Sequence, residues 1–193
     1  EIDRLLLEGM KIADQVIFIS KWLQGYFCIL DSSSNFKEKS KVIYNGCDTN
    51  HFYPNKKSRS DKIKLVTHHW SDNWLKGFDL YTAIDRYLIK NPDSNFDFTY
   101  IGRYCKEYLP QKTVLISPLH GKELGDELRK HDVYVTASRW EPCGMHHIEG
   151  AASGMPVIYH GETGGIVELC EKHGEEFTDF SSFLNCLEKI SKD

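Results

Sequence analysis

The segment from His131 to Glu168 constrains the fold of this chain more than any other. Residues 132–136 and 156–159 have the apolar, β-branched composition of strands, and residues 145–153 between them suit a helix. A strand, a helix and a second strand in so short a stretch are typical of a βαβ unit. The two strands of such a unit run parallel.

The same alternation of strand and helix extends over the rest of the chain from residue 62 onward. Apolar spacing predicts further strands over 62–67, 95–102 and 113–116, and further helices over 78–89, 122–130 and 180–190. Strands interleaved with helices form parallel sheets through right-handed crossovers. We therefore expect an α/β fold, a doubly wound, Rossmann-like parallel sheet with helices on both faces.

Residues 1–53 are organised differently. Helices are expected over 1–13 and 21–30, and short strands over 15–19 and 41–44. Two helices and two strands are too few for an independent core. Segment 1–53 therefore either adds to the main sheet or, as we favour, is the tail of a preceding N-terminal domain plus a connecting strand.

A polar, basic run over 54–61 lacks any periodicity and is predicted to be a linker. The main domain is then expected over residues 62–193.

Composition excludes several classes of protein. The net charge of −4 and the mixed composition favour an ordinary soluble chain without a nucleic-acid partner. No apolar run reaches the ~20 residues of a membrane span, and the first residues lack the pattern of a signal peptide. The six cysteines never occur as C-x-x-C, so we expect free thiols and a cytoplasmic location.

Two carboxylates, Glu141 and Glu149, flank the turn and helix of the central segment. Glu141 follows a predicted strand end, where open α/β sheets bind ligands, and Pro142 and Gly144 permit a tight turn. The backbone N–H groups of residues 143–146 would begin the helix and offer an anion site. This pattern suits a phosphate with hydroxyl groups on either side, and so an activated sugar; the alternative is a pair of solvated surface acids.

Spacing alone is weak evidence, because Glu168 and Glu176 repeat the interval without such a context. Lys76, at a predicted helix start, is a further candidate for phosphate binding or else a solvated lysine. The Gly164-Gly165 pair either admits a ligand closely or is an ordinary turn.

Metal and cofactor motifs are not indicated. The adjacent pairs His68-His69 and His146-His147 have side chains that point in different directions, and no H-E-x-x-H, Cys/His or Asp-x-Asp ligand spacing occurs. The motifs G-x-G-x-x-G, G-x-x-x-x-G-K and G-x-S-x-G are also missing. We therefore expect neither a metal nor a resident cofactor.

Three motifs follow one another in the central segment: Glu141-Pro-Cys-Gly-Met-His-His-Ile-Glu149, Gly154-Met-Pro-Val-Ile158 and Gly164-Gly165-Ile-Val-Glu168. Upstream lie Lys76-Gly77 and Val42-Ile-Tyr-Asn-Gly-Cys-Asp48. In this order and at these distances they resemble the glycosyl transferases group 1 family, retaining enzymes of the GT-B type that include sucrose synthases and bacterial mannosyltransferases. The resemblance covers nearly the whole chain and implies the C-terminal, donor-binding half of a GT-B architecture.

The resemblance also implies a role for each motif residue. The residues implied for the donor sugar are Glu141, Gly144 and Met145. Those implied for the diphosphate are Lys76, Cys143, Gly144 and His146. Glu149 would bind the ribose. The implied activity is retaining, metal-independent transfer from a nucleotide diphosphate sugar, whose base and sugar are left open.

Two departures from the family pattern matter. The family has an arginine where this chain has Ser71, and losing that contact costs ~1.5–3 kcal/mol unless Arg103 or Arg139 replaces it. The family's acceptor domain and catalytic groups precede the region resembled here. We therefore expect this chain alone to bind but not to transfer, and any peripheral membrane association to occur through that missing N-terminal domain.

Other functions stay open at this point. Ser71 is compatible with a nucleotide-sugar-binding module that has lost catalysis. Phosphorylases that carry pyridoxal phosphate on a lysine, and nucleotide-sugar epimerases, are related alternatives. A glycosidase that uses Glu141 and Glu149 is least favoured, because the family assigns both carboxylates to binding.

Overall fold

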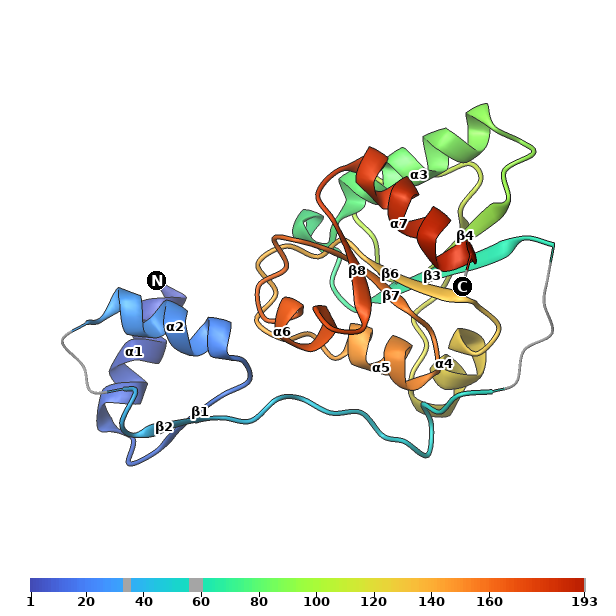
Figure 1. Cartoon of the computed structure of the whole chain (residues 1–193). Coiled ribbons are helices and arrows are strands. Elements are labelled where there is room, and N and C mark those ends of the chain that lie inside the picture. Colours follow the sequence, from blue (N-terminus) through green and yellow to red (C-terminus); the bar gives the residue numbers. More distant parts are fainter. Residues whose placement is uncertain (33–35, 56–60, 193) are drawn as a thin grey trace.

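The structure, a computed structural model, describes residues 1–32, 36–55 and 61–192. Six parallel strands form one sheet in the order β5–β4–β3–β6–β7–β8 (Figure 1). The strands are β3 (Ile63–His69), β4 (Phe96–Gly102), β5 (Val114–Ile116), β6 (Val133–Thr136), β7 (Val157–His160) and β8 (Gly174–Phe177). The predicted doubly wound parallel sheet is confirmed.

The sheet begins at its centre. From β3 the chain proceeds to β4 and β5 on one side, and then returns to the other side of β3 to form β6, β7 and β8. At such a reversal, neighbouring connections leave the carboxyl ends of the strands in opposite directions. A crevice opens there, and it is where open α/β sheets bind ligands.

Helices cover both faces of the sheet. α3 (Phe78–Lys90) and α7 (Phe180–Lys192) lie on one face, and α4 (Gly121–Leu128), α5 (His146–Ala152) and α6 (Val167–Cys170) lie on the other (Figure 1). Each face has its own apolar core. Residues that form the core under α3 and α7 include Phe78, Ile84 and Phe183. Those under the opposite helices include Leu124, Leu128 and Cys170.

The N-terminal segment forms a separate small unit. Its elements are α1 (Ile2–Ile12), β1 (Val16–Phe18), α2 (Lys21–Leu30) and β2 (Ser40–Val42). The two strands pair with each other in parallel and do not join the six-stranded sheet, so the alternative in which segment 1–53 adds to the main sheet is wrong. Val16, Phe18 and Phe27 form its core. Residues 56–60 of the predicted linker lie outside the described residues.

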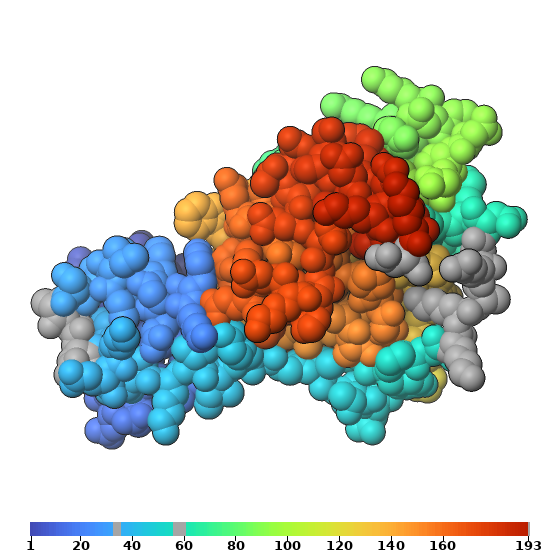
Figure 2. All heavy atoms as spheres, in the orientation of Figure 1, coloured from blue at the N-terminus to red at the C-terminus, as the bar shows by residue number. Residues whose placement is uncertain are grey.

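Hydrogen bonds among the described residues join the N-terminal unit, and residues 43–55 that follow it, to the larger unit. The two units are in contact in Figure 2. The Glu168 carboxylate accepts from the backbone N–H groups of Lys21 and Trp22, at 3.0 and 2.6 Å, and from the Tyr44 hydroxyl at 2.6 Å. The Asn45 side-chain amide donates to the backbone carbonyl of Cys143 at 2.7 Å.

Within the described ranges, none of the helices is long and apolar enough to cross a membrane.

Candidate functional site

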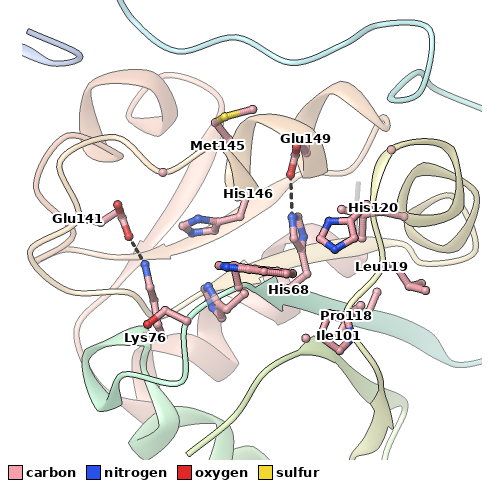
Figure 3. Close-up of a pocket in the computed structure, with 17 residues that line it drawn as sticks. His68, Lys76, Ile101, Pro118, Leu119, His120, Glu141, Met145, His146 and Glu149 are labelled. Carbon is pink, nitrogen blue, oxygen red and sulfur yellow. Dashed lines mark hydrogen bonds and ion pairs between the residues drawn. The ribbon is translucent and has the colours of Figure 1, made fainter.

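A cavity of about 360 Å³ lies at the carboxyl edge of the sheet, at the reversal between β3 and β6 (Figure 3). Its walls come from the ends of β3 and β4, from the loops after β5 and β6, and from α5. The predicted residues that it brings together are Ser71, Lys76, Glu141, Gly144, Met145, His146 and Glu149. Residues remote in sequence thus converge on the crevice that the sheet topology provides.

Lys76 and Glu141 form an ion pair at one end of the cavity (Figure 3). Lys76 is the last residue of a single 3₁₀ turn, η1 (Trp74–Lys76), and does not open α3 as expected from the sequence. Gly77 follows in the left-handed region at φ 98°, and a Cβ there would come within 2.2 Å of the Cβ of Ala137. Only glycine therefore lets this turn lie against the end of β6, which brings the lysine beside Glu141.

The turn between Glu141 and α5 is equally crowded. A Cβ on Gly144 would lie 2.5 Å from Nδ1 of His146, so this position requires a residue without a side chain. Nε2 of His146 contacts the Thr136 hydroxyl at 3.0 Å, which fixes the ring over the end of β6. The helix begins one residue later than predicted, so Met145 precedes it and is half exposed toward the cavity.

Cys143 is placed differently from its neighbours. Its side chain is buried away from the cavity, and burial raises the pKa of its thiol. Its carbonyl is taken by the Asn45 amide. Cys143 could therefore contact a ligand in this cavity through its backbone N–H group.

The opposite end of the cavity carries Glu149 (Figure 3). Its Oε2 lies 2.8 Å from Nε2 of His68, and Nδ1 of the same imidazole lies 3.0 Å from the Tyr134 hydroxyl. Tyr134 is fully buried in β6. A tyrosine and a histidine from the sheet thus fix the orientation of the carboxylate, an arrangement that the sequence motif does not contain.

Charge in the cavity is sparse. Among the described residues that line it, Lys76 is the one lysine or arginine, and Glu141 and Glu149 are the acids. Burial lowers the pKa of His69 and of His146 well below the usual imidazole value, with Lys76 contributing to both shifts. These rings are therefore neutral at pH 7. No group of three or more His, Cys, Asp or Glu in the described part of the chain could hold a metal ion.

The three residues proposed around the missing arginine lie in different places. Ser71 lines the cavity, but neither arginine proposed to replace the missing one does. The Arg103 guanidinium lies 4.2 Å from the centre of the Trp70 ring, and Arg139 forms an ion pair with Asp79.

The Gly164-Gly165 pair also lies elsewhere. A Cβ on Gly164 would meet the Trp22 ring at 3.1 Å, and one on Gly165 would meet the Pro142 carbonyl oxygen at 1.7 Å. Both glycines are required by close packing of the backbone.

Sequence reasoning missed part of the wall. Lining residues to which the sequence assigns no role include Ile101, Pro118, Leu119 and Leu124. Trp70 is expected from the sequence to stack on a ligand or to cover the sheet edge, and the loops at 102–103 and 120–121 are expected to affect the choice of base. The loops at 102–103 and 120–121 follow predicted strands, which is the signal that points to them. The apolar lining residues could not be predicted in this way, because in the sequence they look the same as apolar residues of the core.

The fold defines the class: the six-stranded parallel sheet and its helices have the fold of the Rossmann-like C-terminal domain of GT-B glycosyltransferases. The chain belongs to the glycosyl transferases group 1 family, whose sequence profile matches residues 66–193. No curated protein matches the chain significantly.

Solved structures share the fold at low sequence identity. Sucrose-phosphate synthase from Thermosynechococcus elongatus has a TM-score of 0.80 at 18% identity, over 99% of this chain and 52% of that one. TarM from S. aureus, in complex with fondaparinux, α-GlcNAc-glycerol and UDP, has a TM-score of 0.78 at 13% identity over 99% and 39%. The C-terminal domain of the group 1 glycosyl transferase LpcC from Francisella tularensis has 0.60 at 20% over 77% and 89%. This chain thus spans about half or less of the length of the sucrose-phosphate synthase and TarM chains.

Proposed function

We propose that this chain is the donor-binding part of a retaining, metal-independent glycosyltransferase that uses a nucleotide diphosphate sugar. The proposal rests on the polarity of the cavity, with Glu141 and Lys76 at one end, Glu149 at the other, and the Gly144 turn between them. A diphosphate on the turn would direct hexose hydroxyls to Glu141 and ribose hydroxyls to Glu149. The solved structures of TarM with UDP and of Arabidopsis starch synthase IV with ADP support a nucleotide in this fold.

The chemistry follows from where charge develops. As the bond between sugar and diphosphate breaks, negative charge grows on the departing phosphate. Lys76, which is held beside Glu141, and the N–H groups of the turn would stabilise that charge more than they stabilise the bound donor. The helix end adds only ~0.3–1 kcal/mol. Positioning of the acceptor therefore has to supply much of the remaining rate enhancement.

Transfer is proposed to require a further, N-terminal acceptor domain. α1 buries none of its residues, and its apolar side chains Ile2, Leu5 and Ile12 are largely exposed. A helix with an uncovered apolar face is suited to packing against more protein. We therefore expect this chain alone to bind a donor without transferring it.

Calorimetric titration with UDP, GDP, ADP and their hexose derivatives tests the proposal. Glu149→Ala is expected to weaken binding of nucleotide and nucleotide sugar alike by about 10- to 100-fold, because charge-assisted hydrogen bonds to the ribose are lost. Glu141→Ala should remove only the additional affinity that the sugar gives to a nucleotide sugar over the free nucleotide. Since Lys76 then loses its ion-pair partner, free nucleotide should bind as tightly as before or more tightly.

Glu176→Ala provides the matched control, because Glu176 is exposed on β8 and does not line this cavity. It should leave both affinities unchanged. Equal losses from Glu141→Ala and Glu149→Ala would contradict the assigned roles, and no binding of any nucleotide would contradict the function.

One observation favours a second candidate, a module that binds nucleotide sugar without catalysis. Ser71 lines the cavity, and neither Arg103 nor Arg139 reaches it, so the departing phosphate would meet one fixed cation. Assay of the chain together with its N-terminal domain separates the two functions. Donor binding without transfer or donor hydrolysis would favour the module.

A further inference from the structure

A second cavity, of about 700 Å³, lies where the N-terminal unit meets the larger one. Trp22 at the start of α2 forms one wall, and Trp140 forms another. Gly161 and Gly164, in the loop between β7 and α6, also line it. Trp140 directly precedes Glu141, and Gly164 pairs with Glu141 in an isolated β-bridge. The second cavity therefore adjoins the backbone of the residue at the proposed sugar end of the first, although the two share no lining residue.

Trp140 is held in an unfavourable backbone conformation. Its φ is 54°, in the left-handed region, where a bulky residue is an outlier. The N–H groups of Trp140 and Glu141 donate to the carbonyls of Glu162 and Thr163 at 3.1 and 2.8 Å, which holds the strained residue in place. The side chain is nevertheless 63% exposed. Strain that presents a large aromatic ring to solvent, and does not bury it, is typical of a ligand-binding position.

Trp22 is fixed by its surroundings. Its ring lies against the backbone of Gly164, stacks with Tyr26 at 5.9 Å, and meets Trp140 edge-on at 6.2 Å. The hydrogen bonds from Lys21 and Trp22 to Glu168 hold the start of α2 in this position. Two ordered indole rings therefore line one cavity, each contributed by a different unit.

The charge of the cavity selects against an anionic occupant. Lys21 is the one lysine or arginine among its described lining residues, and Glu162 and Glu168 are the acids. Both oxygens of Glu168 already accept hydrogen bonds. The side chain of Glu162 is largely exposed, and its ion pair with the Arg139 guanidinium is long, at 4.0 Å. An uncharged ligand with hydroxyl groups fits these conditions better than a phosphate does.

We propose that this second cavity binds a neutral saccharide, with a sugar ring stacked on Trp140 and hydroxyl groups directed to Glu162. The C–H face of a pyranose ring carries a slight positive charge and packs against the electron-rich face of an indole. Because the cavity adjoins Glu141, the saccharide is the acceptor of the transfer proposed above, and the inference rests on that function. The volume is large enough for more than one sugar ring.

The test is saturation-transfer-difference NMR on the whole chain, with methyl α-glucoside, methyl α-galactoside, methyl α-mannoside, N-acetylglucosamine and maltose as probes, with and without saturating UDP. At least one probe should receive saturation from the protein. Trp140→Ala should reduce that signal about tenfold at equal probe concentration, since the stacking surface is lost, whereas Trp140→Phe should retain most of it. Trp74→Ala removes an indole that does not line this cavity and should change nothing.

Folding of the variants is checked by thermal unfolding. Trp140→Gly relieves the left-handed strain, so it should unfold at an equal or higher temperature while losing the saccharide signal. The proposal is overturned if no probe binds, or if Trp140→Ala and Trp74→Ala give the same signal as the unchanged chain. Calorimetry of nucleotide binding on the same samples separates the saccharide site from the donor site. Nucleotide binding without a saccharide signal refutes the saccharide site alone. Absence of nucleotide binding refutes the donor site.

Discussion

At the scale of single residues, the histidines around the start of α5 determine the charge of the donor cavity. Burial keeps His69 and His146 neutral, and it lowers the pKa of His147 to about 4. A diphosphate entering this cavity would therefore meet Lys76 as the one lysine or arginine among its described lining residues, together with the acids Glu141 and Glu149. Affinity for the phosphates should then depend on backbone N–H groups more than on side-chain charge.

The same burial predicts a loss of stability in acid. Below its ordinary pKa of 6.5, His147 binds a proton in the unfolded chain but not in the folded one, so the free energy of unfolding falls as the pH drops from 6.5 toward 4. The shift corresponds to roughly 3 kcal/mol. His69 and His146 act in the same direction.

Denaturant unfolding at stepped pH measures this loss. His147→Gln should reduce the slope of unfolding free energy against pH by up to about one proton between pH 6.5 and 4. His173→Gln, at an exposed position, should leave the slope unchanged. Identical slopes for His147→Gln and the unchanged chain would show that His147 is not the titrating group.

At the scale of elements, apolar composition and spacing locate most of the helices and strands and miss a few short segments. Each predicted strand and helix of the main sheet is present, within one or two residues at most ends. The 3₁₀ turn η1, the four-residue α6 and the edge strand β8 are not predicted. The single turns η1 and α6 are too short to show a helical period. β8 (Gly-Glu-Glu-Phe) buries only its last residue, whereas the equally short β6 and β7 are largely apolar and fully buried.

The packing of α5 on the sheet depends on one glycine. A Cβ on Gly150 would lie 2.4 Å from ring carbons of Tyr134, which is fully buried and cannot move aside. Gly150→Ala is therefore expected to lower the free energy of unfolding by about 1–3 kcal/mol, through overpacking.

The same substitution in α1 gives the opposite expectation. Nothing lies within 4 Å of a Cβ built on Gly9, so Gly9→Ala should stabilise its helix by about 0.5–1 kcal/mol. Denaturant unfolding of both variants, with hydrogen exchange to assign the change to α1 or to α5, measures the pair. A stabilising Gly150→Ala would refute the close approach of α5 to β6.

The residues of the candidate site could be predicted from the sequence only where they belong to a recognisable motif. Glu141, Gly144, Met145 and Glu149 belong to one short motif, and they do reach one cavity together with Lys76. Contacts that depend on the folded arrangement, such as those of Glu149 with the sheet, have no signature in sequence spacing. Neither Arg103 nor Arg139 lines the cavity, because each is held by a partner, Trp70 or Asp79, that the fold brings near it.

At the scale of the whole molecule, Glu168 is the main link between the two units. It repeats the seven-residue interval of the donor motif with Glu176, but its carboxylate binds the start of α2 and the Tyr44 hydroxyl. This contact raises the pKa of Tyr44 to about 12, because the neutral phenol donates to the carboxylate. The sequence gives no sign of this role, since the partners lie more than a hundred residues away.

Removing this link should loosen the N-terminal unit. Glu168→Ala leaves the N–H groups of Lys21 and Trp22 without their acceptor, so their amide hydrogen exchange should accelerate by at least tenfold. Glu171→Ala, at an exposed position just after α6, should leave exchange unchanged. Equal exchange in the two variants would mean that other contacts hold the units together.

The bond from Asn45 to the carbonyl of Cys143 ties the connecting segment to the back of the turn that faces the donor cavity. Energetic coupling between two sites is reciprocal. A ligand that orders this turn therefore also favours the ordered position of the segment tied to it, by the same free energy. Nucleotide binding in the donor cavity would thereby reduce the mobility of the connecting segment. A partner that holds this segment in place would, in return, raise the affinity for the nucleotide.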